Sequence, residues 1–251
     1  MTEAAALDTG REPALLGQTV VVLGGSAGIG LETARQAHAA GARVVITGRN
    51  AERLERAADE VDALDTAAFD VTDFDRLGQF FDELPGPIDH VMVSGSGPYY
   101  APLADLDLAE ARRDLEQHLF LPIQVARLAV GRVRPGGSLV LIGGTGGRRP
   151  SVGFALISTL TAGMPALTRT LALEIAPIRV NLVAAGFVDT GLSARLLGDD
   201  LDARRAELRA TLPIGRVVGP GDVAALSVHL MSNTALTGAT YDVDGGQQIV
   251  F

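Results

Sequence analysis

Four glycines stand close together near the start of the chain, in the stretch VVVLGGSAGIGLETA (residues 20–34). An apolar run precedes them and a helical pattern follows, which predicts a buried strand, a turn and a helix. Gly24 can adopt backbone angles closed to other residues, Gly28 lets the main chain approach a pyrophosphate, and Gly30 lets helix and strand pack closely. The free N–H groups at the helix start then face the anion. The stretch favours a dinucleotide-binding turn over a plain tight turn.

The residues that end the next strand-like run bear on which dinucleotide this turn would hold. That run closes with Thr47-Gly48-Arg49-Asn50. A carboxylate at this place binds the ribose 2′-hydroxyl of NAD, whereas an arginine accommodates the 2′-phosphate of NADP. The segment has no acidic residue, so Arg49 favours NADP(H) over NAD(H). The alternative is that Arg49 is only a solvated surface residue.

Apolar runs typical of strands alternate with amphipathic segments along the chain. The expected strands are 19–24, 43–47, 66–69, 88–94, 138–143, 178–184 and 239–243. The expected helices are 29–40, 51–62, 73–83, 107–132, 155–176 and 221–232. Pro165 lacks a backbone donor, so we expect a disturbance of its helix near residues 161–165.

This alternation predicts an α/β fold, a single doubly wound parallel sheet of about seven strands flanked by helices. We expect residues 1–16 to be a mobile N-terminal tail. Residues 17–251 are expected to form one dinucleotide-binding Rossmann domain, since no linker or repeat interrupts them.

Composition excludes several classes of function. The chain has a net charge of −9 and no cysteine. The negative charge argues against nucleic acid and anionic membrane surfaces as partners. Without cysteine there is no disulfide, thiolate metal site or cysteine nucleophile. No apolar run approaches the roughly 20 residues that span a bilayer, and the first residues lack the basic-then-apolar order of a signal peptide. We therefore expect a cytoplasmic protein, and no His, Asp or Glu cluster has metal-site spacing.

The order of these motifs resembles the short-chain dehydrogenase/reductase family over residues 17–251. The glycine turn matches, although Leu23 replaces the family's usual threonine, and Ser94-Gly95-Ser96-Gly97 stands where the family has Asn-Asn-Ala-Gly. Ala185–Thr190 resembles a Pro-Gly stretch without its proline, and Val243–Gly246 resembles the C-terminal signature. The cofactor-binding residues so expected are Gly24, Ser26, Gly28, Ile29, Gly30, Arg49, Asp70, Val71, Ser94, Gly95, Gly186, Val188 and Thr190. The resemblance also implies a small-molecule substrate and a homotetramer or homodimer.

The same resemblance exposes a gap in the catalytic residues. The family's asparagine, serine, tyrosine and lysine positions fall at His118, Gly144, Ile157 and Thr161. All four residues are changed. A different alignment cannot restore the tyrosine and lysine pair, because the chain contains no lysine at all and its only tyrosines are at positions 99, 100 and 241. The resemblance therefore implies the fold and the cofactor site without the family's usual mechanism.

Three functions remain open. One is an oxidoreductase acting on an activated acceptor, such as a quinone, an imine or a conjugated carbonyl, with His118, Tyr99 or Tyr100 as candidate proton donors. The second is an inactive NADP(H)-binding sensor, scaffold or partner subunit. The third is a non-redox dehydration or isomerisation with His118 as base. Against these roles, His118 is also typical of a core or interface histidine, and both tyrosines of a pocket wall.

Three further charged residues have two interpretations each. Arg148 and Arg149 are candidates for clamping an anionic substrate, or are a solvated pair in a loop. Asp189 is expected to cap or orient the backbone near it.

Overall fold

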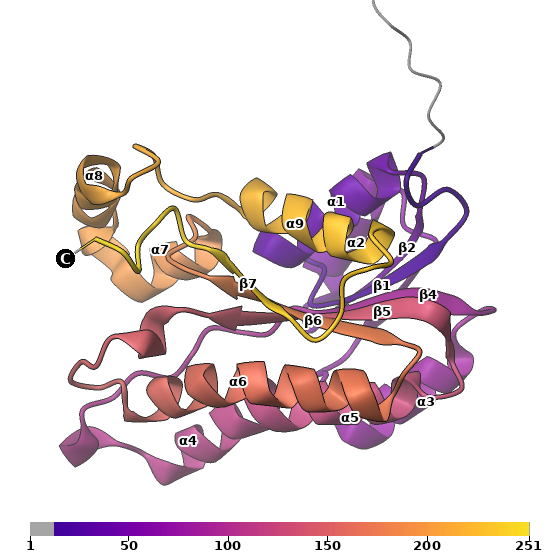
Figure 1. The fold of residues 1–251 in the computed structure, drawn as a ribbon, viewed down its shortest axis with the longest axis horizontal. Helices are drawn as coiled ribbons and strands as arrows, with labels where there is room; N and C mark the ends of the chain where they lie inside the picture. The colour runs from indigo at the N-terminus through magenta and orange to yellow at the C-terminus, as the bar shows by residue number, and fades with distance from the viewer. Residues whose placement is uncertain (1–12, 251) are drawn as a thin grey trace, which may run out of the picture.

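The computed structural model describes residues 13–250, and within them seven parallel strands form one sheet in the order β3-β2-β1-β4-β5-β6-β7 (Figure 1). The strands are β1 (Thr19–Leu23), β2 (Arg43–Gly48), β3 (Asp65–Ala68), β4 (Ile88–Val93), β5 (Val133–Gly144), β6 (Arg179–Ala185) and β7 (Thr240–Val243). The strand order reverses between β1 and β4, which is where such sheets open a crevice at their carboxyl edge. The expected fold class is confirmed.

Helices cover both faces of this sheet (Figure 1). One face carries α1 (Gly28–Ala39), α2 (Ala51–Val61) and α9 (Pro220–Ser232). The other carries α3 (Phe74–Glu83), α5 (Leu121–Ala129) and α6 (Ala155–Glu174). Short 3₁₀ turns are η1 (Leu103–Asp105), η3 (Gly146–Arg148) and η4 (Gly198–Asp200). No helix within residues 13–250 is long and apolar enough to cross a membrane.

The alternation of side chains along β1 builds a separate core on each face. Val21 packs with residues of α3, α5 and α6, whereas Val20 and Val22 pack with residues of α1, α2 and α9. All three valines are fully buried, as expected for a parallel strand covered on both sides. Caps fix where the flanking helices start: Asn50 accepts the N–H of Arg53 at 2.8 Å, which begins α2.

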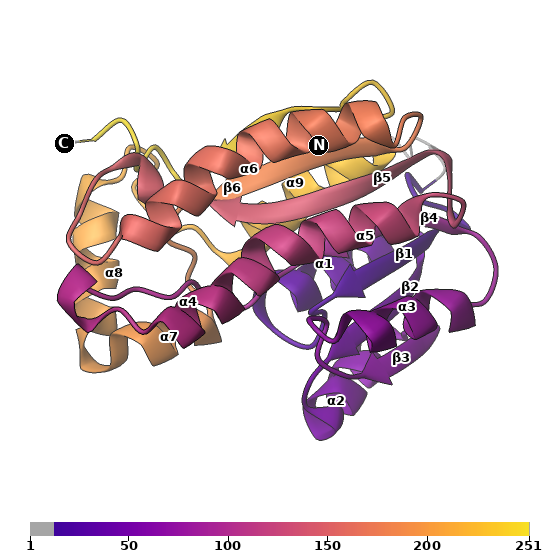
Figure 2. The same ribbon diagram turned by 90° about the horizontal axis from the view of Figure 1, so that it is seen from below.

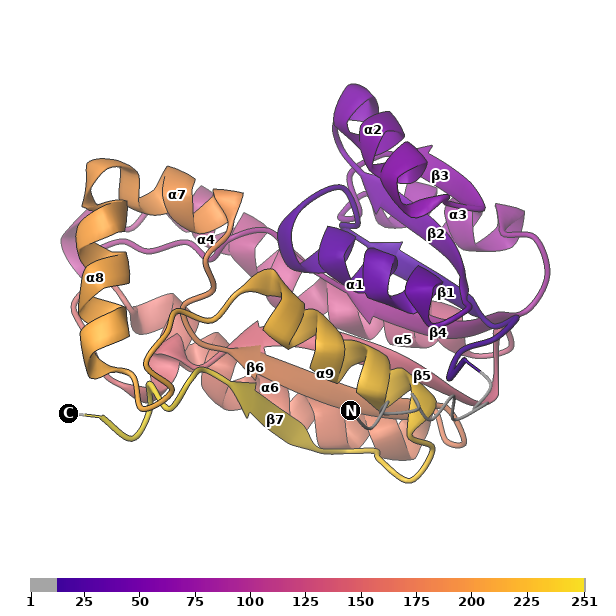
Figure 3. The same ribbon diagram turned by 90° about the horizontal axis from the view of Figure 1, so that it is seen from above.

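Three further helical segments gather at the end of the molecule where the strands finish (Figures 2 and 3). They are α4 (Leu108–Leu115), α7 (Gly191–Leu197) and α8 (Leu201–Thr211). Neither α7 nor α8 was expected from the sequence pattern. Along the chain, α7 and α8 lie between β6 and α9. In space they lie beyond the carboxyl edge of the sheet (Figures 2 and 3).

The structure corrects three expectations about individual segments. The helix expected over residues 107–132 is divided, because a π-helical turn, η2 (Glu116–Phe120), lies between α4 and α5. Helix α6 runs unbroken through Pro165. The tail does not reach residue 16, because Leu15 is fully buried and its N–H donates to the Ala40 carbonyl at 2.9 Å. Residues 1–12 of that tail and residue 251 lie outside the described residues.

We predict opposite effects on stability for two helical glycines. A Cβ atom on Gly30 would lie 2.2 Å from the Gly24 carbonyl oxygen, so Gly30→Ala forces the helix away from the strand. It should lower the free energy of unfolding by about 1–3 kcal/mol. Gly163, exposed in α6, has nothing within 4 Å of a Cβ atom. Gly163→Ala should raise that free energy by about 0.5–1 kcal/mol, because alanine loses less backbone entropy.

Urea unfolding followed by circular dichroism measures both changes. Equal effects of the two substitutions would contradict the close packing of α1 against the turn.

Candidate functional site

A cleft of 280 Å³ opens at the carboxyl edge of the sheet, between the β1–α1 turn, the ends of β2 and β4, and the start of α7. It is lined by Gly24, Ser26, Ala27, Gly28, Ile29, Thr47, Gly48, Arg49, Arg53, Phe69, Asp70, Val71, Ser94, Gly95, Ser96, Gly97, Gln117, Leu121, Thr190, Gly191, Leu192 and Arg195. Most of the residues expected to bind a cofactor are therefore brought together. The exceptions are Gly30, Gly186 and Val188.

Those three exceptions do not line the cleft and have other contacts. Gly30 packs α1 onto the turn, as described above. A Cβ atom on Gly186 would lie 2.7 Å from the Asp244 side chain, so this glycine allows the loop after β6 to pass the C-terminal segment. Val188 is buried and forms a β-bridge with Val218.

The turn between β1 and α1 depends on the absence of side chains. Gly24 has a φ of +85°, and a Cβ atom there would lie 2.3 Å from the Ser94 carbonyl oxygen. Gly28 has a φ of +55°, and its missing Cβ would lie 3.7 Å from the Thr190 side chain. The turn thus touches the segment after β4 on one side and the start of α7 on the other.

The N-terminus of α1 is left available for an anion. Its N-cap residue, Ala27, has no side chain to accept a hydrogen bond, and the first turn of the helix has no acidic residue. By contrast, the first N–H groups of α2 and α3 are bonded by Asn50 and Asp73. Free N–H groups at the positive end of a helix dipole favour phosphate, so this cleft fits a dinucleotide.

Three arginines line the same cleft in a chain of net charge −9. Arg49 lies beside Asp70, with 4.0 Å between guanidinium and carboxylate. Within residues 13–250, the guanidinium groups of Arg53 and Arg195 form no hydrogen bond or ion pair. Arg53 and Arg195 were not expected from the sequence; Arg53 lies in the first turn of α2, which starts shortly after Arg49.

Gly144, Ile157 and Thr161, the expected positions of the family's serine, tyrosine and lysine, offer no group that can donate a proton to a ligand. Ile157 and Thr161 are buried in α6. The Thr161 hydroxyl donates back to the Ile157 carbonyl at 2.7 Å. At the end of β5, a Cβ atom on Gly144 would make ordinary van der Waals contacts, the nearest at 3.7 Å from the Ala185 carbonyl oxygen.

The three candidate proton donors lie next to the cleft without lining it. The Tyr99 hydroxyl accepts the N–H of Asp107 at 3.1 Å, at the start of α4. Tyr100 is 44% exposed and its ring centroid lies 5.1 Å from that of Phe154; burial, and then the nearby charge of Asp114, raise the pKa of its hydroxyl. His118, in η2, has Nε2 3.2 Å from the Ser96 carbonyl oxygen.

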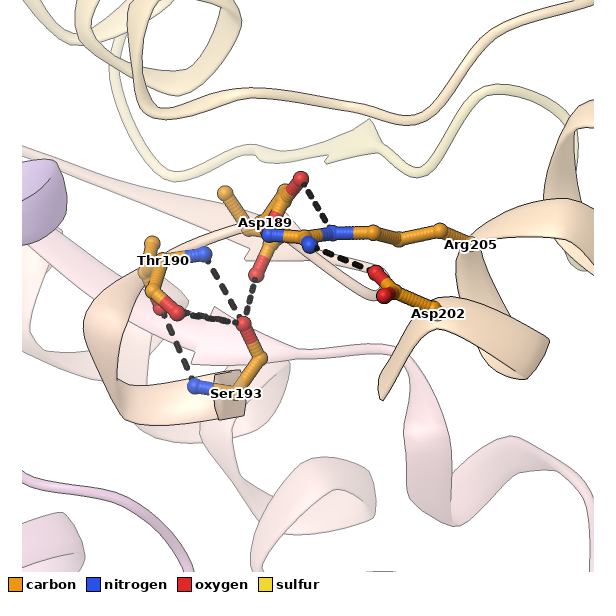
Figure 4. Close-up of polar contacts among 6 residues, drawn as sticks. Asp189, Thr190, Ser193, Asp202 and Arg205 are labelled. Carbon is orange, nitrogen blue, oxygen red and sulfur yellow. Dashed lines mark hydrogen bonds and ion pairs between the residues drawn. The ribbon is translucent and has the colours of Figure 1, made fainter. Parts of the chain in front are cut away.

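The segment that carries Thr190 into the cleft is held by a polar network (Figure 4). Thr190 and Ser193 form a reciprocal capping box at the start of α7. The Asp189 carboxylate receives two hydrogen bonds from Arg205 of α8, at 2.9 and 2.8 Å, and Asp202 bonds the same guanidinium at 3.0 Å. The expectation that Asp189 caps nearby backbone is therefore wrong: it joins α8 to the end of β6.

Arg148 and Arg149 are both exposed, as expected for a solvated pair in a loop, and each is also bonded within the chain. Arg148 forms a bidentate ion pair with Asp242 in β7, with Nη2 to Oδ1 at 2.7 Å. Arg149 donates to the carbonyl oxygen of Val250. Both side chains tie η3 to the C-terminal segment.

A larger and more open cavity of 710 Å³ lies along β7, between Arg148, Arg169, Leu226 and Tyr241. It includes none of the residues expected to bind a cofactor. Within residues 13–250, no group of His, Asp or Glu side chains could hold a metal ion.

Comparison with known proteins agrees with this geometry. Residues 24–248 match the family model described as "Enoyl-(Acyl carrier protein) reductase". The chain is 30% identical to short-chain dehydrogenase/reductase ATR9 of Stachybotrys chlorohalonatus, over 93% of this chain and 98% of that protein. It is 28% identical to short-chain dehydrogenase/reductase malC of Malbranchea aurantiaca, over 92% and 95%.

Solved structures give the same result. The MalC Reductase/Diels-Alderase from Malbranchea aurantiaca superposes with a TM-score of 0.87 at 27% identity, covering 95% of this chain and 99% of that one. A small-chain dehydrogenase in complex with NADPH superposes with a TM-score of 0.79 at 26% identity, covering 93% and 99%. The chain therefore belongs to the short-chain dehydrogenase/reductase family.

Proposed function

We propose that this protein binds NADP(H) in the cleft beside Gly24 and Gly28 and reduces an activated acceptor that needs no proton donor, an iminium ion above all. The observation that carries the proposal is the residue set at the family's catalytic positions. Gly144, Ile157 and Thr161 supply no acid there, while the cleft keeps the features that suit a dinucleotide.

The preference for the phosphorylated cofactor is supported by charge. Arg49 and Arg53 both line the cleft, and the carboxylate of Asp70 lies beside Arg49. Arg49 is 4.0 Å from that acid and Arg53 is unpaired within residues 13–250, so a dianionic phosphate finds two guanidinium groups. The ribose-binding carboxylate of NAD-preferring sites has no counterpart at the end of β2.

The choice of acceptor follows from the proton balance. A bound dihydronicotinamide supplies a hydride. Reduction of a ketone then leaves an alkoxide, which needs an acid worth about 10²–10⁴ in rate and polarisation of its oxygen worth about 10²–10³. Addition of the hydride to an iminium carbon instead turns the C=N π electrons into a nitrogen lone pair, and no proton is required. The apolar Ile157 suits the reduction of an iminium ion, because that reaction needs no proton from the protein.

A second candidate is a cycloaddition, because the structural relative from Malbranchea aurantiaca is named a Diels-Alderase as well as a reductase. A cycloaddition transfers no proton either, so the same residues at the catalytic positions are compatible with it. Product formed at equal rate with and without NADPH would identify this reaction.

We predict that the two arginines at the β2 side of the cleft set the cofactor preference. Arg49→Ser and Arg53→Ser should each weaken NADPH binding roughly 10- to 100-fold, the range for losing a hydrogen bond to a charged group. NADH binding should change little, because NADH lacks the 2′-phosphate. Isothermal titration calorimetry measures both dissociation constants.

Arg56→Ser is the matched control. Arg56 lies on the same helix, is exposed and does not line the cleft. Equal losses for NADPH and NADH, or a loss with Arg56→Ser, would contradict the assignment. Failure of the unmodified protein to bind either nucleotide would overturn the proposed function.

We predict that NADPH oxidation is faster with a cyclic iminium than with a matched cyclic ketone by at least about 10²-fold, the lower bound for a missing general acid. The combined variant Gly144→Ser, Ile157→Tyr and Thr161→Lys should gain ketone reduction, and Gly144 has room for the added side chain. Absorbance of NADPH follows both rates.

Comparable rates for ketone and iminium in the unmodified protein would contradict this acceptor class. NADPH binding without turnover on iminium, quinone or conjugated carbonyl would instead identify a sensor, scaffold or partner subunit.

A further inference from the structure

His118 is held at both ring nitrogens by oxygen atoms that can only accept hydrogen bonds. Its Nδ1 lies 3.0 Å from the Asp114 carbonyl oxygen and 3.1 Å from the Asp114 carboxylate. Its Nε2 lies 3.2 Å from the Ser96 carbonyl oxygen. A neutral imidazole carries one N–H and one lone pair, so one nitrogen would face an acceptor without a proton between them. The imidazolium form satisfies both sides.

The carboxylate of Asp114 supports the charged form. Its side chain is 4% exposed, and one of its oxygens, Oδ2, has no hydrogen-bond partner. The other oxygen accepts the N–H of Tyr99 at 3.1 Å. Within residues 13–250, His118 is the cationic group that contacts this carboxylate. A buried carboxylate without a cation is costly.

Helices α4 and α5 also pack against η2; of their charged residues (Glu110, Arg112, Arg113, Asp114 and Arg127), Asp114 is the one whose charge shifts the pKa of His118. Tyr100, in the segment before α4, is the other titratable group coupled to Asp114. Helix α6 packs against η2 and has no charged residue from Ala155 to Thr168. Burial lowers the pKa of His118, but the hydrogen bonds and charge of Asp114, together with the bond to Ser96, raise it above its ordinary 6.5.

His118 bonds to Ser96, which belongs to one wall of the cleft proposed to bind the cofactor. Ser94, Gly95, Ser96 and Gly97 all line it. On one side this wall touches the glycine turn, where Gly24 meets the Ser94 carbonyl. On the other side, η2 brings two consecutive residues to Ser96: the Ser96 hydroxyl donates to Gln117, and its carbonyl accepts from His118. π-helical turns recur at functional sites.

We propose that His118, as an imidazolium paired with Asp114, is a positioning residue that fixes the Ser94–Gly97 wall for the cofactor, so that protonation of His118 and nucleotide affinity are coupled. This role rests on the proposed binding of NADP(H) in that cleft. It differs from proton donation to a substrate, since both N–H groups are already engaged. The coupling is reciprocal: bound nucleotide favours the protonated ring.

The direction of the pH effect follows from the raised pKa of His118. The contribution of protonated His118 to the stability of the folded protein is complete below pH 6.5, the ordinary pKa of histidine. It is lost as the pH rises through the higher pKa that His118 has in the folded protein. Neutral His118 keeps one N–H, so either the ion pair or the bond to Ser96 is weakened.

The first test reads the cofactor-free protein by NMR with ¹⁵N labelling. Both His118 ring nitrogens should be protonated at pH 6, and the Ser94–Gly97 amide signals should shift with a common inflection above pH 6.5. In His118→Gln, which does not titrate, those amide shifts should vanish. Asp114→Asn should move the inflection to lower pH, which a purely structural role would not do. A neutral His118 at pH 6, or amides that do not follow its titration, would overturn the proposal.

The second test measures NADP⁺ affinity from pH 6 to 9 in the unmodified protein and in His118→Gln. The 2′-phosphate itself titrates near pH 6, so the difference between the two profiles isolates His118. Affinity of the unmodified protein should fall about tenfold relative to the variant as the pH rises, the size of one charged hydrogen bond. His38→Gln, an exposed histidine far along α1, is the matched control and should follow the unmodified profile.

The two tests separate two failures. Parallel profiles for His118→Gln and the unmodified protein would overturn the coupling while leaving NADP(H) binding intact. No NADP⁺ binding at any pH would overturn the proposed function, and the NMR titration would still decide whether His118 fixes the wall.

Discussion

The close approach of three backbone segments is the constraint on which the rest of the structure depends. The β1–α1 turn passes so near the segment after β4 that a Cβ atom on Gly24 would lie 2.3 Å from the Ser94 carbonyl, and α1 passes so near the turn that Gly30 admits no side chain. This contact follows from the sheet order, which places β4 beside β1. It brings the start of α1, the wall at Ser94–Gly97 and the end of β2 around one cleft. Larger residues at these positions would push the walls apart.

Charge within this cleft is arranged against the trend of the whole molecule. The chain is acidic overall, yet three arginines, one just after β2, one in α2 and one in α7, line the same cleft, and the helix that starts there has no side-chain cap. An uncapped helix and unpaired arginines are features that a protein tolerates where a ligand compensates them. The net negative charge of the molecule limits non-specific attraction of polyanions to this opening, because long-range attraction is set by the net charge.

The sequence is informative wherever structure follows from local periodicity or from a turn. Strand and helix limits agree with the expected ranges closely for β1, β2, β4, α1 and α2, because runs of buried valines and amphipathic segments are local signals. The glycine turn and the loss of a catalytic tyrosine and lysine are also visible in residue types alone. Arg53, Arg195 and the pairing of Asp189 with Arg205 were missed, since they depend on which long side chains tertiary structure brings together. The short helices α7 and α8 and the π-helical turn at His118 have no clear local pattern. Pro165 and Leu15 show the reverse effect, in which packing overrides a local expectation.

The lobe formed by α7 and α8 begins and ends side by side. Val188 bridges Val218 where the chain leaves and re-enters the lobe, and the Asp189–Arg205 pair closes the base (Figure 4). Thr190 and three residues of α7 (Gly191, Leu192 and Arg195) line the cleft, and its other lining residues come from segments outside the lobe. Helix α8 contributes no residue to this lining, so its exposed surface can vary in sequence without altering a wall of the cleft.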